Sequence, residues 1–190
     1  MKSTVKIKDA KSYWLALKKT GWLDWIPNVD HKQLQLNIDA AIKEHGVQFA
    51  YLGLTHFSFD FECIFADDSY PPLLGDFASF SRNEFNPKSA KSQRDPKDKK
   101  KRLVEFKVGR KKYTCSVDFA SDYADECIID LVNKALTESG SQYQYQNLPA
   151  VDQCGYLSFV PQSIFDTGVK GGLIPTQKDV DLILGNDDDD

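Results

Sequence analysis

The sequence predicts an α+β protein in which antiparallel β-hairpins pack against amphipathic helices. Apolar residues recur at helical spacing over residues 31–45 and 121–136, and they alternate with polar residues over 57–62 and 104–119. The chain has 190 residues, of which 41% are hydrophobic and 27% are charged. A chain of this length buries roughly 70% of its unfolded surface, so it needs no disulfide or metal to be stable. We therefore expect a single α+β domain over residues 1–190.

Two helices are predicted in the first quarter of the chain. In residues 9–20, Tyr13 and Leu17 are expected to face the core, and Gly21 ends the helix. Residues 31–45 form a clearer amphipathic helix, because apolar side chains return at helical spacing and a glycine follows where a C-terminal cap belongs. These apolar positions are Leu34, Ile38, Ala41 and Ile42.

A first β-hairpin is predicted directly after these helices. Val47–Leu54 is apolar on both faces, which is typical of a central strand. Residues 57–62 alternate strictly between aromatic and polar side chains, which indicates a half-buried strand. The turn that joins the two strands is expected at residues 53–56.

A second hairpin is predicted over residues 104–119. Apolar and charged residues alternate before a turn at Gly109 and Arg110, and the alternation returns over residues 113–119. A third helix then begins near Ser121 or Asp122, either of which can cap it, and continues through Leu136. Two further strands and a last helix capped by Thr176 are expected at residues 142–146, 155–160 and 176–184.

A long basic connector is predicted at residues 67–102. Loops of this length inside compact domains are usually functional or disordered, and residues 88–102 have almost no apolar side chain to bury. We expect a mobile, solvated loop there. Its basic run at 97–102 has the charge to bind nucleic-acid phosphates. However, no aromatic side chain is interleaved for base stacking, and the net charge of the protein is −4, so a nucleic-acid partner is not favoured.

The sequence contains a weak internal similarity. Shifting the chain by 94 positions places residues 46–51 on 140–145, and the helices before these segments coincide at their apolar positions. One interpretation is a duplication of two helix–strand–strand units, 21–66 and 115–160, around one core and joined by the basic loop 67–102. The other interpretation is that any two amphipathic helices followed by glycine and a strand align this well.

Charge is unevenly distributed along the chain. Residues 88–112 contain twelve of the 24 Lys and Arg residues and three acids, whereas residues 113–190 contain fourteen acids and three bases. The acids are densest over 118–130, beyond what a favourable interaction with a helix N-terminus requires. We interpret them as a negative surface for a basic partner protein, which would speed association by electrostatic steering. The predicted partner-binding residues are Asp118, Asp122, Asp125, Glu126 and Asp130.

Motifs for catalysis are sparse. The three histidines are too far apart for a zinc-binding helix, and neither a Cys-x-x-Cys pair nor a Gly-x-Ser-x-Gly elbow occurs, so we assign no catalytic residue, metal or cofactor. An enzymatic alternative is that Glu105 and Lys107 form half of a metal-dependent nuclease signature. The second acid of that signature is missing, because Asp95 and Asp98 are poorly placed for it. Glu and Lys facing solvent on a half-exposed strand is the simpler interpretation.

The composition favours a cytoplasmic protein. The N-terminus has no apolar run of the signal-peptide type, and no apolar stretch is long enough to span a membrane. The four cysteines lie far apart without disulfide or zinc spacing, so we expect reduced thiols in or near the core. They are Cys63, Cys115, Cys127 and Cys154.

Three segments of the C-terminal half carry a family resemblance. They are the hairpin VEFKVGRKKYTCSVDF at 104–119, the helix at 128–136, and DQCGYLSFVPQ at 152–162, in which a strand leads into Pro-Gln and a short helix. In this order they resemble the immunity proteins that bacteria encode beside the toxins of polymorphic-toxin systems. The pattern departs from expectation at residues 160–163, where Val-Pro-Gln-Ser replaces Thr-Pro-Glu-Gln.

The resemblance implies a cytoplasmic protein that is not an enzyme and that neutralises one cognate toxin by steric and electrostatic occlusion. These families share no catalytic residues, so none is assigned from them. Nuclease toxins are typically basic, and an acidic inhibitor can occupy such a groove with complementary charge. A non-enzymatic adaptor domain without a toxin partner is a further alternative.

Overall fold

The structure is a computed structural model that describes residues 7–62, 64, 69–119, 121 and 123–185. Helices and β-strands alternate along it, and the predicted α+β class is confirmed. The chain divides into two compact units, which are Met1–Ser58 with Gln146–Asp190 (unit 1) and Phe59–Tyr145 (unit 2). The chain passes between the units within strands β1 (Phe57–Asp60) and β5 (Gln144–Leu148).

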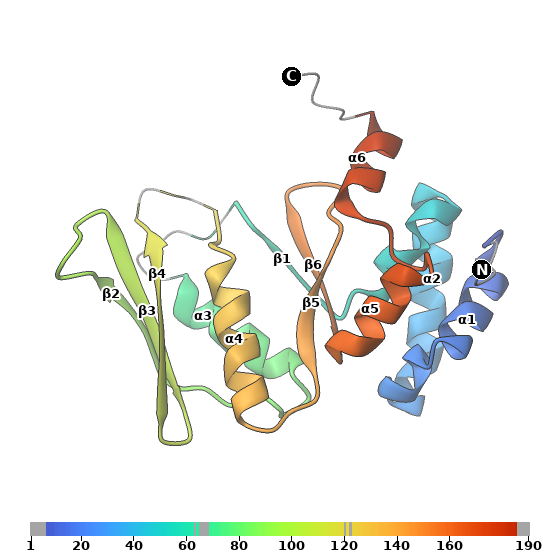
Figure 1. Cartoon of the computed structure of the whole chain (residues 1–190). Helices are drawn as coiled ribbons and strands as arrows, with labels where there is room; N and C mark the ends of the chain where they lie inside the picture. The colour runs from blue at the N-terminus through green and yellow to red at the C-terminus, as the bar shows by residue number, and fades with distance from the viewer. Residues whose placement is uncertain (1–6, 63, 65–68, 120, 122, 186–190) are drawn as a thin grey trace. The chain divides into compact units, whose positions relative to one another are not determined.

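Unit 1 is mostly helical (Figure 1). Its first and last helices begin where the sequence predicts, because Asp9 and Thr176 each form a capping box, with Ser12 and Asp179 respectively. These caps satisfy backbone N–H groups that a helix start leaves without partners. The elements of unit 1 are α1 (Ala10–Lys19), η1 (Trp22–Trp25), η2 (Asn28–Asp30), α2 (His31–His45), η3 (Val47–Leu54), β6 (Cys154–Val160), α5 (Gln162–Lys170) and α6 (Gln177–Leu184).

The strand predicted at Val47–Leu54 is wrong, because these residues form the 3-10 helix η3. This helix packs along α2, and Gly53 permits the contact: a Cβ atom at Gly53 would lie 2.6 Å from the backbone N and Cα of Ile38. On another side, the Tyr51 hydroxyl donates a hydrogen bond to the Pro149 carbonyl at 3.0 Å. Burial against several neighbours explains why η3 is apolar apart from the exposed Gln48.

The hairpin predicted over residues 47–62 is therefore also wrong. Strand β1 forms at its predicted place, but its neighbour is the distant strand β6 in a sheet of order β1-β6-β5. The His56 backbone N–H donates to the Leu157 carbonyl at 2.7 Å, next to the start of β1. The alternation in residues 57–62 indicated a strand correctly, whereas it contained no information about which strand pairs with it.

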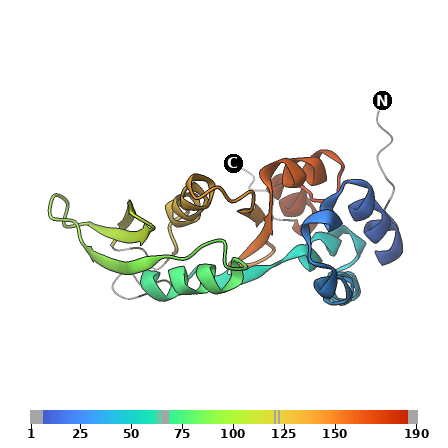
Figure 2. The ribbon, with the colours of Figure 1, turned by 90° about the horizontal axis from the view of Figure 1, so that it is seen from below.

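Unit 2 contains a three-stranded antiparallel sheet that α3 and α4 cover on one face (Figures 1 and 2). The order is β2-β3-β4, and the predicted hairpin of β3 and β4 is confirmed. Gly109 makes its turn with a φ of 59°, a left-handed conformation that glycine adopts without strain. The elements are α3 (Tyr70–Phe80), β2 (Lys88–Arg94), β3 (Lys101–Val108), β4 (Lys111–Asp118) and α4 (Cys127–Glu138).

The loop predicted at 67–102 is wrong over most of its described length, because it contains α3 and β2. Pro71 and Pro72 lie in the first turn of α3, where the missing backbone N–H groups cost nothing. The lysine-rich β2 is an edge strand, where charged side chains remain in solvent and discourage pairing with other chains. The solvated character of this segment was expected, but its regular structure was not.

The predicted cap of the third helix is also wrong. Helix α4 begins at Cys127 with Glu126 at the N-cap, several residues after Ser121. Within the proposed duplication, α2 and α4 are both helices, but α2 is followed by η3 and α4 by strand β5. The two aligned segments therefore do not share a helix–strand–strand order, and the duplication itself stays a prediction.

One asparagine fastens α4 to the edge strand β5. The Asn133 side-chain amide donates to the Tyr145 carbonyl and accepts from the Tyr145 N–H, both at 2.8 Å. The Tyr145 hydroxyl then donates to the Phe77 carbonyl in α3 at 2.6 Å. These hydrogen bonds, of which the one from Tyr145 to Phe77 is fully buried, fix α3, α4 and β5 together.

Candidate functional site

The predicted acidic residues lie between the end of the sheet and the first turn of α4. Asp118 is the last residue of β4, Asp125 and Glu126 immediately precede α4, and Asp130 lies in its first turn. Asp118, Glu126 and Asp130 are exposed, whereas Asp125 is half-buried. Asp122 lies outside the described residues.

The segment before α4 is held in place by hydrogen bonds within unit 2. The Ala124 N–H donates to the Phe61 carbonyl at 2.8 Å, and the Asp125 N–H donates to the Tyr70 hydroxyl at 3.2 Å. The Asp125 carboxylate accepts from the Cys127 N–H at 2.9 Å. Asp125 therefore has a structural role at the start of α4. The exposed acids Asp118, Glu126 and Asp130 are better placed than Asp125 to contact a partner.

The hydrogen bond to Phe61 brings two further acids to this surface. The Tyr123 hydroxyl donates to the Glu62 carboxylate, and the Glu62 N–H donates to the Asp60 carboxylate at 2.9 Å. Sequence reasoning missed both acids and the tyrosine. The alternation over 57–62 indicated that Asp60 and Glu62 face outward, but no local signal places them beside residues 123–126.

We name this group the acidic surface. Its chemistry is that of an interaction surface, because Tyr123 is 45% exposed and its hydroxyl contacts the Glu62 carboxylate. A tyrosine buries a large area at low cost in side-chain entropy, and tyrosines are enriched among the residues that dominate binding energy. The acidic surface consists of Asp60, Glu62, Asp118, Tyr123, Asp125, Glu126 and Asp130.

Glu105 does not resemble a free metal ligand in this structure. Its side chain is 9% exposed, and its two carboxylate oxygens contact Lys91 Nζ at 2.8 Å and Lys112 Nζ at 2.7 Å. Hydrogen bonds from Lys112 and then Lys91 hold the pKa of Glu105 below its usual value. Lys107 lies two residues along the same strand and is exposed. A divalent ion at Glu105 would have to displace both lysines.

Replacing Glu105 with glutamine should lower the free energy of unfolding by about 1 kcal/mol at neutral pH, a value typical of a well-formed surface ion pair. The folded pKa lies below the usual value of 4.5, so the contribution of the carboxylate is complete above pH 4.5. It disappears as the pH falls through the folded pKa. Urea unfolding at several pH values checks this, with Glu84→Gln, at an exposed acid of the same unit, as the matched control.

The described cysteines are Cys115, Cys127 and Cys154, which are all half-buried; Cys63 lies outside the described residues. A hydrogen bond with the Cys115 thiol and burial both raise the pKa of Cys127. A raised pKa keeps a thiol protonated and makes it a poor nucleophile. Cys127 therefore behaves as a packing residue beside Cys115.

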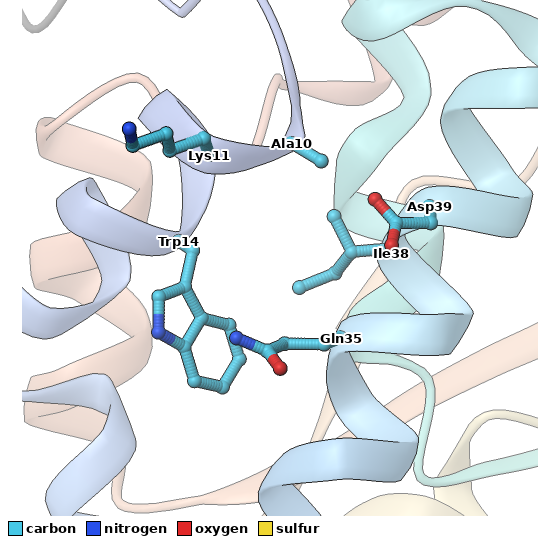
Figure 3. A pocket seen from close by; sticks show the side chains of 6 residues that line it. All are labelled: Ala10, Lys11, Trp14, Gln35, Ile38 and Asp39. Carbon is cyan, nitrogen blue, oxygen red and sulfur yellow. The ribbon is translucent and has the colours of Figure 1, made fainter.

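Unit 1 has a hollow of about 310 Å³ between α1 and α2 (Figure 3). The indole of Trp14 lies opposite Gln35 and Ile38, with Lys11 and Asp39 at its margins. Its described lining contains no cysteine, histidine or serine. The hollow thus offers an aromatic wall and two opposite charges, which suit contact with a ligand better than covalent chemistry.

Trp14 and its neighbours also limit the role of His31. The His31 ring packs edge-on against Trp14, and its Nε2 lies 3.0 Å from the Ile26 carbonyl and 3.3 Å from the Leu23 carbonyl. These carbonyls require a donor, so Nε2 carries a proton. Among the described residues, no group of three or more His, Cys, Asp and Glu side chains is arranged to hold a metal ion.

No protein-family model matches the chain, and no curated protein or solved structure matches it either. None of the helices in the described part of the chain has the length and apolar character needed to cross a membrane. The geometry of the acidic surface is therefore the main guide to function.

Proposed function

We propose that this protein binds and neutralises a cognate basic protein toxin, and that the acidic surface of unit 2 is its binding site. The observation that carries the proposal is the exposed Tyr123, which is hydrogen-bonded to Glu62 and precedes Asp125 and Glu126 in the chain. The family resemblance of the C-terminal half supplies the toxin as the partner class.

The arrangement suits a partner that presents Lys or Arg around an apolar pocket. The tyrosine ring would fill the pocket, while the exposed acids Asp118, Glu126 and Asp130 meet the basic rim. Opposite charges at the rim chiefly accelerate association and discriminate between partners, and burial of the ring slows dissociation. Binding of this kind neutralises a toxin by covering its substrate groove, without any chemistry by the inhibitor.

Site-specific cross-linking tests this proposal. A photo-reactive phenylalanine analogue at position 123 should cross-link one basic protein in the source cell, because the ring there is expected to lie at the centre of the interface. The same analogue at Phe80, an exposed aromatic position on α3 with 44% exposure, serves as the matched control. The proposal requires a product at position 123 that is absent from position 80.

Cross-linking to an acidic protein, or equal products from both positions, would contradict the site assignment. Producing the captured partner alone in cells then distinguishes a toxin inhibitor from an adaptor domain. A partner that is harmless when produced alone is not a toxin, and this result would favour the adaptor.

A further inference from the structure

Half of the Lys and Arg residues of the chain lie in residues 88–112, which belong to the β2–β3–β4 sheet and its turns. The sequence indicates a solvated connector for residues 88–102, but in the structure these residues form β2, a turn and the start of β3. An ordered sheet holds its side chains at fixed spacing, with neighbouring strands about 4.8 Å apart. The sheet therefore holds the positive side chains at fixed distances from one another, whereas in a flexible loop these distances would vary.

Three lysines form one row across the sheet. Lys107 on the central strand is directly opposite Lys88 on β2 and Lys112 on β4. Like charges at directly opposed positions destabilise a sheet. Lys112 is compensated by its contact with Glu105 at 2.7 Å, whereas Lys88 and Lys107 are exposed and make no ion pair with another described residue. A sheet with this row is less stable than one with neutral residues there, unless an anion binds.

The nearby hairpin turn adds to this charge. Arg110 is exposed in the turn between β3 and β4, and within the described ranges it makes no ion pair either. Lys111 is paired with Glu138 at 3.4 Å on the helix-covered side of the strand. Lys88, Lys107 and Arg110 thus leave three uncompensated positive charges at one end of the sheet, and we name these three residues the basic cluster.

The rest of this sheet face is polar. Alternation places Gln93, Thr114 and Ser116 on the same face as Glu105, and all three are exposed. Leu103 is the one apolar residue among the described positions in these rows, and it is half-buried. Hydroxyl, amide and cationic groups are the donors that proteins use to contact phosphates and sugars. A protein partner would need an apolar or aromatic centre, which this face does not provide.

We propose that the basic cluster and the polar sheet face bind the phosphate backbone of a nucleic-acid duplex without reading its sequence. A duplex is favoured over a single strand because single strands are held largely by bases stacking on aromatic side chains. The exposed side chains of this face include no aromatic residue among the described positions. Duplex phosphates need only fixed positive charges and hydrogen-bond donors. Asp118 of the acidic surface lies on this sheet face as well, opposite Lys101 at the end of the strands away from the basic cluster. The duplex test changes none of the acidic residues, so its outcome does not depend on the proposed toxin partner.

Fluorescence anisotropy with short DNA and RNA duplexes of mixed sequence tests the inference. The variant Lys88→Gln, Lys107→Gln, Arg110→Gln should bind both duplexes at least about tenfold more weakly in low salt. A plot of log affinity against log salt concentration should also become less steep by about 2.7, because the variant loses three phosphate contacts and each contributes roughly 0.9 to the steepness. A companion variant, Lys88→Arg with Lys107→Arg, should retain binding because it retains the charges.

The matched control removes three exposed lysines of unit 1, Lys19→Gln, Lys32→Gln and Lys43→Gln, and so changes the net charge by the same amount. This control should bind like the unaltered protein. Equal loss in both variants would overturn the site, as would the absence of duplex binding by the unaltered protein. Poly-glutamate binding as tightly as the duplexes would overturn the nucleic-acid assignment in favour of an acidic protein partner.

Discussion

The replacement Gly53→Ala is expected to lower the free energy of unfolding by about 2–3 kcal/mol, which is near the upper end of the usual cost of inserting an extra carbon into a well-packed core. A Cβ atom at this position would lie 2.6 Å from the backbone of Ile38, a distance that real Cβ atoms do not reach. Backbone cannot rotate away as the end of a flexible side chain can. Helix η3 would therefore have to move off α2, which would loosen the buried contacts that both helices share.

A second glycine supplies the control for this prediction. Gly75 lies inside α3, and apart from its chain neighbours and the backbone of its own helix, no atom lies within 4 Å of the position its Cβ would take. Gly75→Ala should therefore be neutral, or stabilising by up to about 1 kcal/mol through helix propensity. Urea unfolding of both variants measures the difference. Equal stabilities would show that η3 does not pack against α2 as described.

The second large effect concerns binding. Tyr123→Ala should weaken binding of the cross-linked partner by about 30-fold or more, which corresponds to the roughly 2 kcal/mol that defines an interface hot spot. Tyr123→Phe keeps the ring and loses the hydrogen bond to Glu62, so it should cost much less than the alanine variant. Surface plasmon resonance separates the rates, and the alanine variant should act mainly on dissociation.

Reversing the exposed acids should act on association instead. Glu126→Lys with Asp130→Lys places two positive charges toward a basic partner, so the association rate should fall and lose its dependence on salt. The matched control is Asp39→Lys with Glu44→Lys, which reverses two exposed acids of α2 in unit 1. An equal fall in both double variants would mean that net charge, rather than the acidic surface, controls the rate.

The local part of this fold could be predicted from the sequence. Capping residues at Thr176 and Asp179, and the alternation around Gly109, specify structure through neighbours a few residues away. Hydrophobic periodicity located α1, α2 and the hairpin of β3 and β4, and the cap at Thr176 located α6. These elements depend little on which distant segment packs against them.

The errors arose where a distant contact decides the local structure. An apolar run such as Val47–Leu54 suits a buried strand or a buried helix equally, and the approach of Gly53 to Ile38 favours the helix. Pro71 and Pro72 suggested a loop, yet prolines are also well tolerated in a first helical turn. The lysines of residues 88–94 suggested a solvated loop, although an edge strand tolerates them.

In the candidate site, too, the features set by neighbouring residues could be predicted, whereas those set by distant contacts could not. The sequence located the exposed acids Asp118, Glu126 and Asp130, because their density can be read directly from the chain. The contact between Tyr123 and Glu62 joins positions 61 residues apart, and no spacing rule predicts it. Likewise, the lysine row depends on the register of β2 against β3, which includes a bulge between Lys88 and Lys91.

Protection of cells tests the central claim most directly. The partner captured at position 123 is produced in bacterial cells alone, with the unaltered protein, or with the variant Tyr123→Ala, Glu126→Lys, Asp130→Lys. We expect the partner alone to stop growth, the unaltered protein to restore it, and the variant to fail while it accumulates to the same level. Growth without the protein, or full protection by the variant, would contradict neutralisation through the acidic surface.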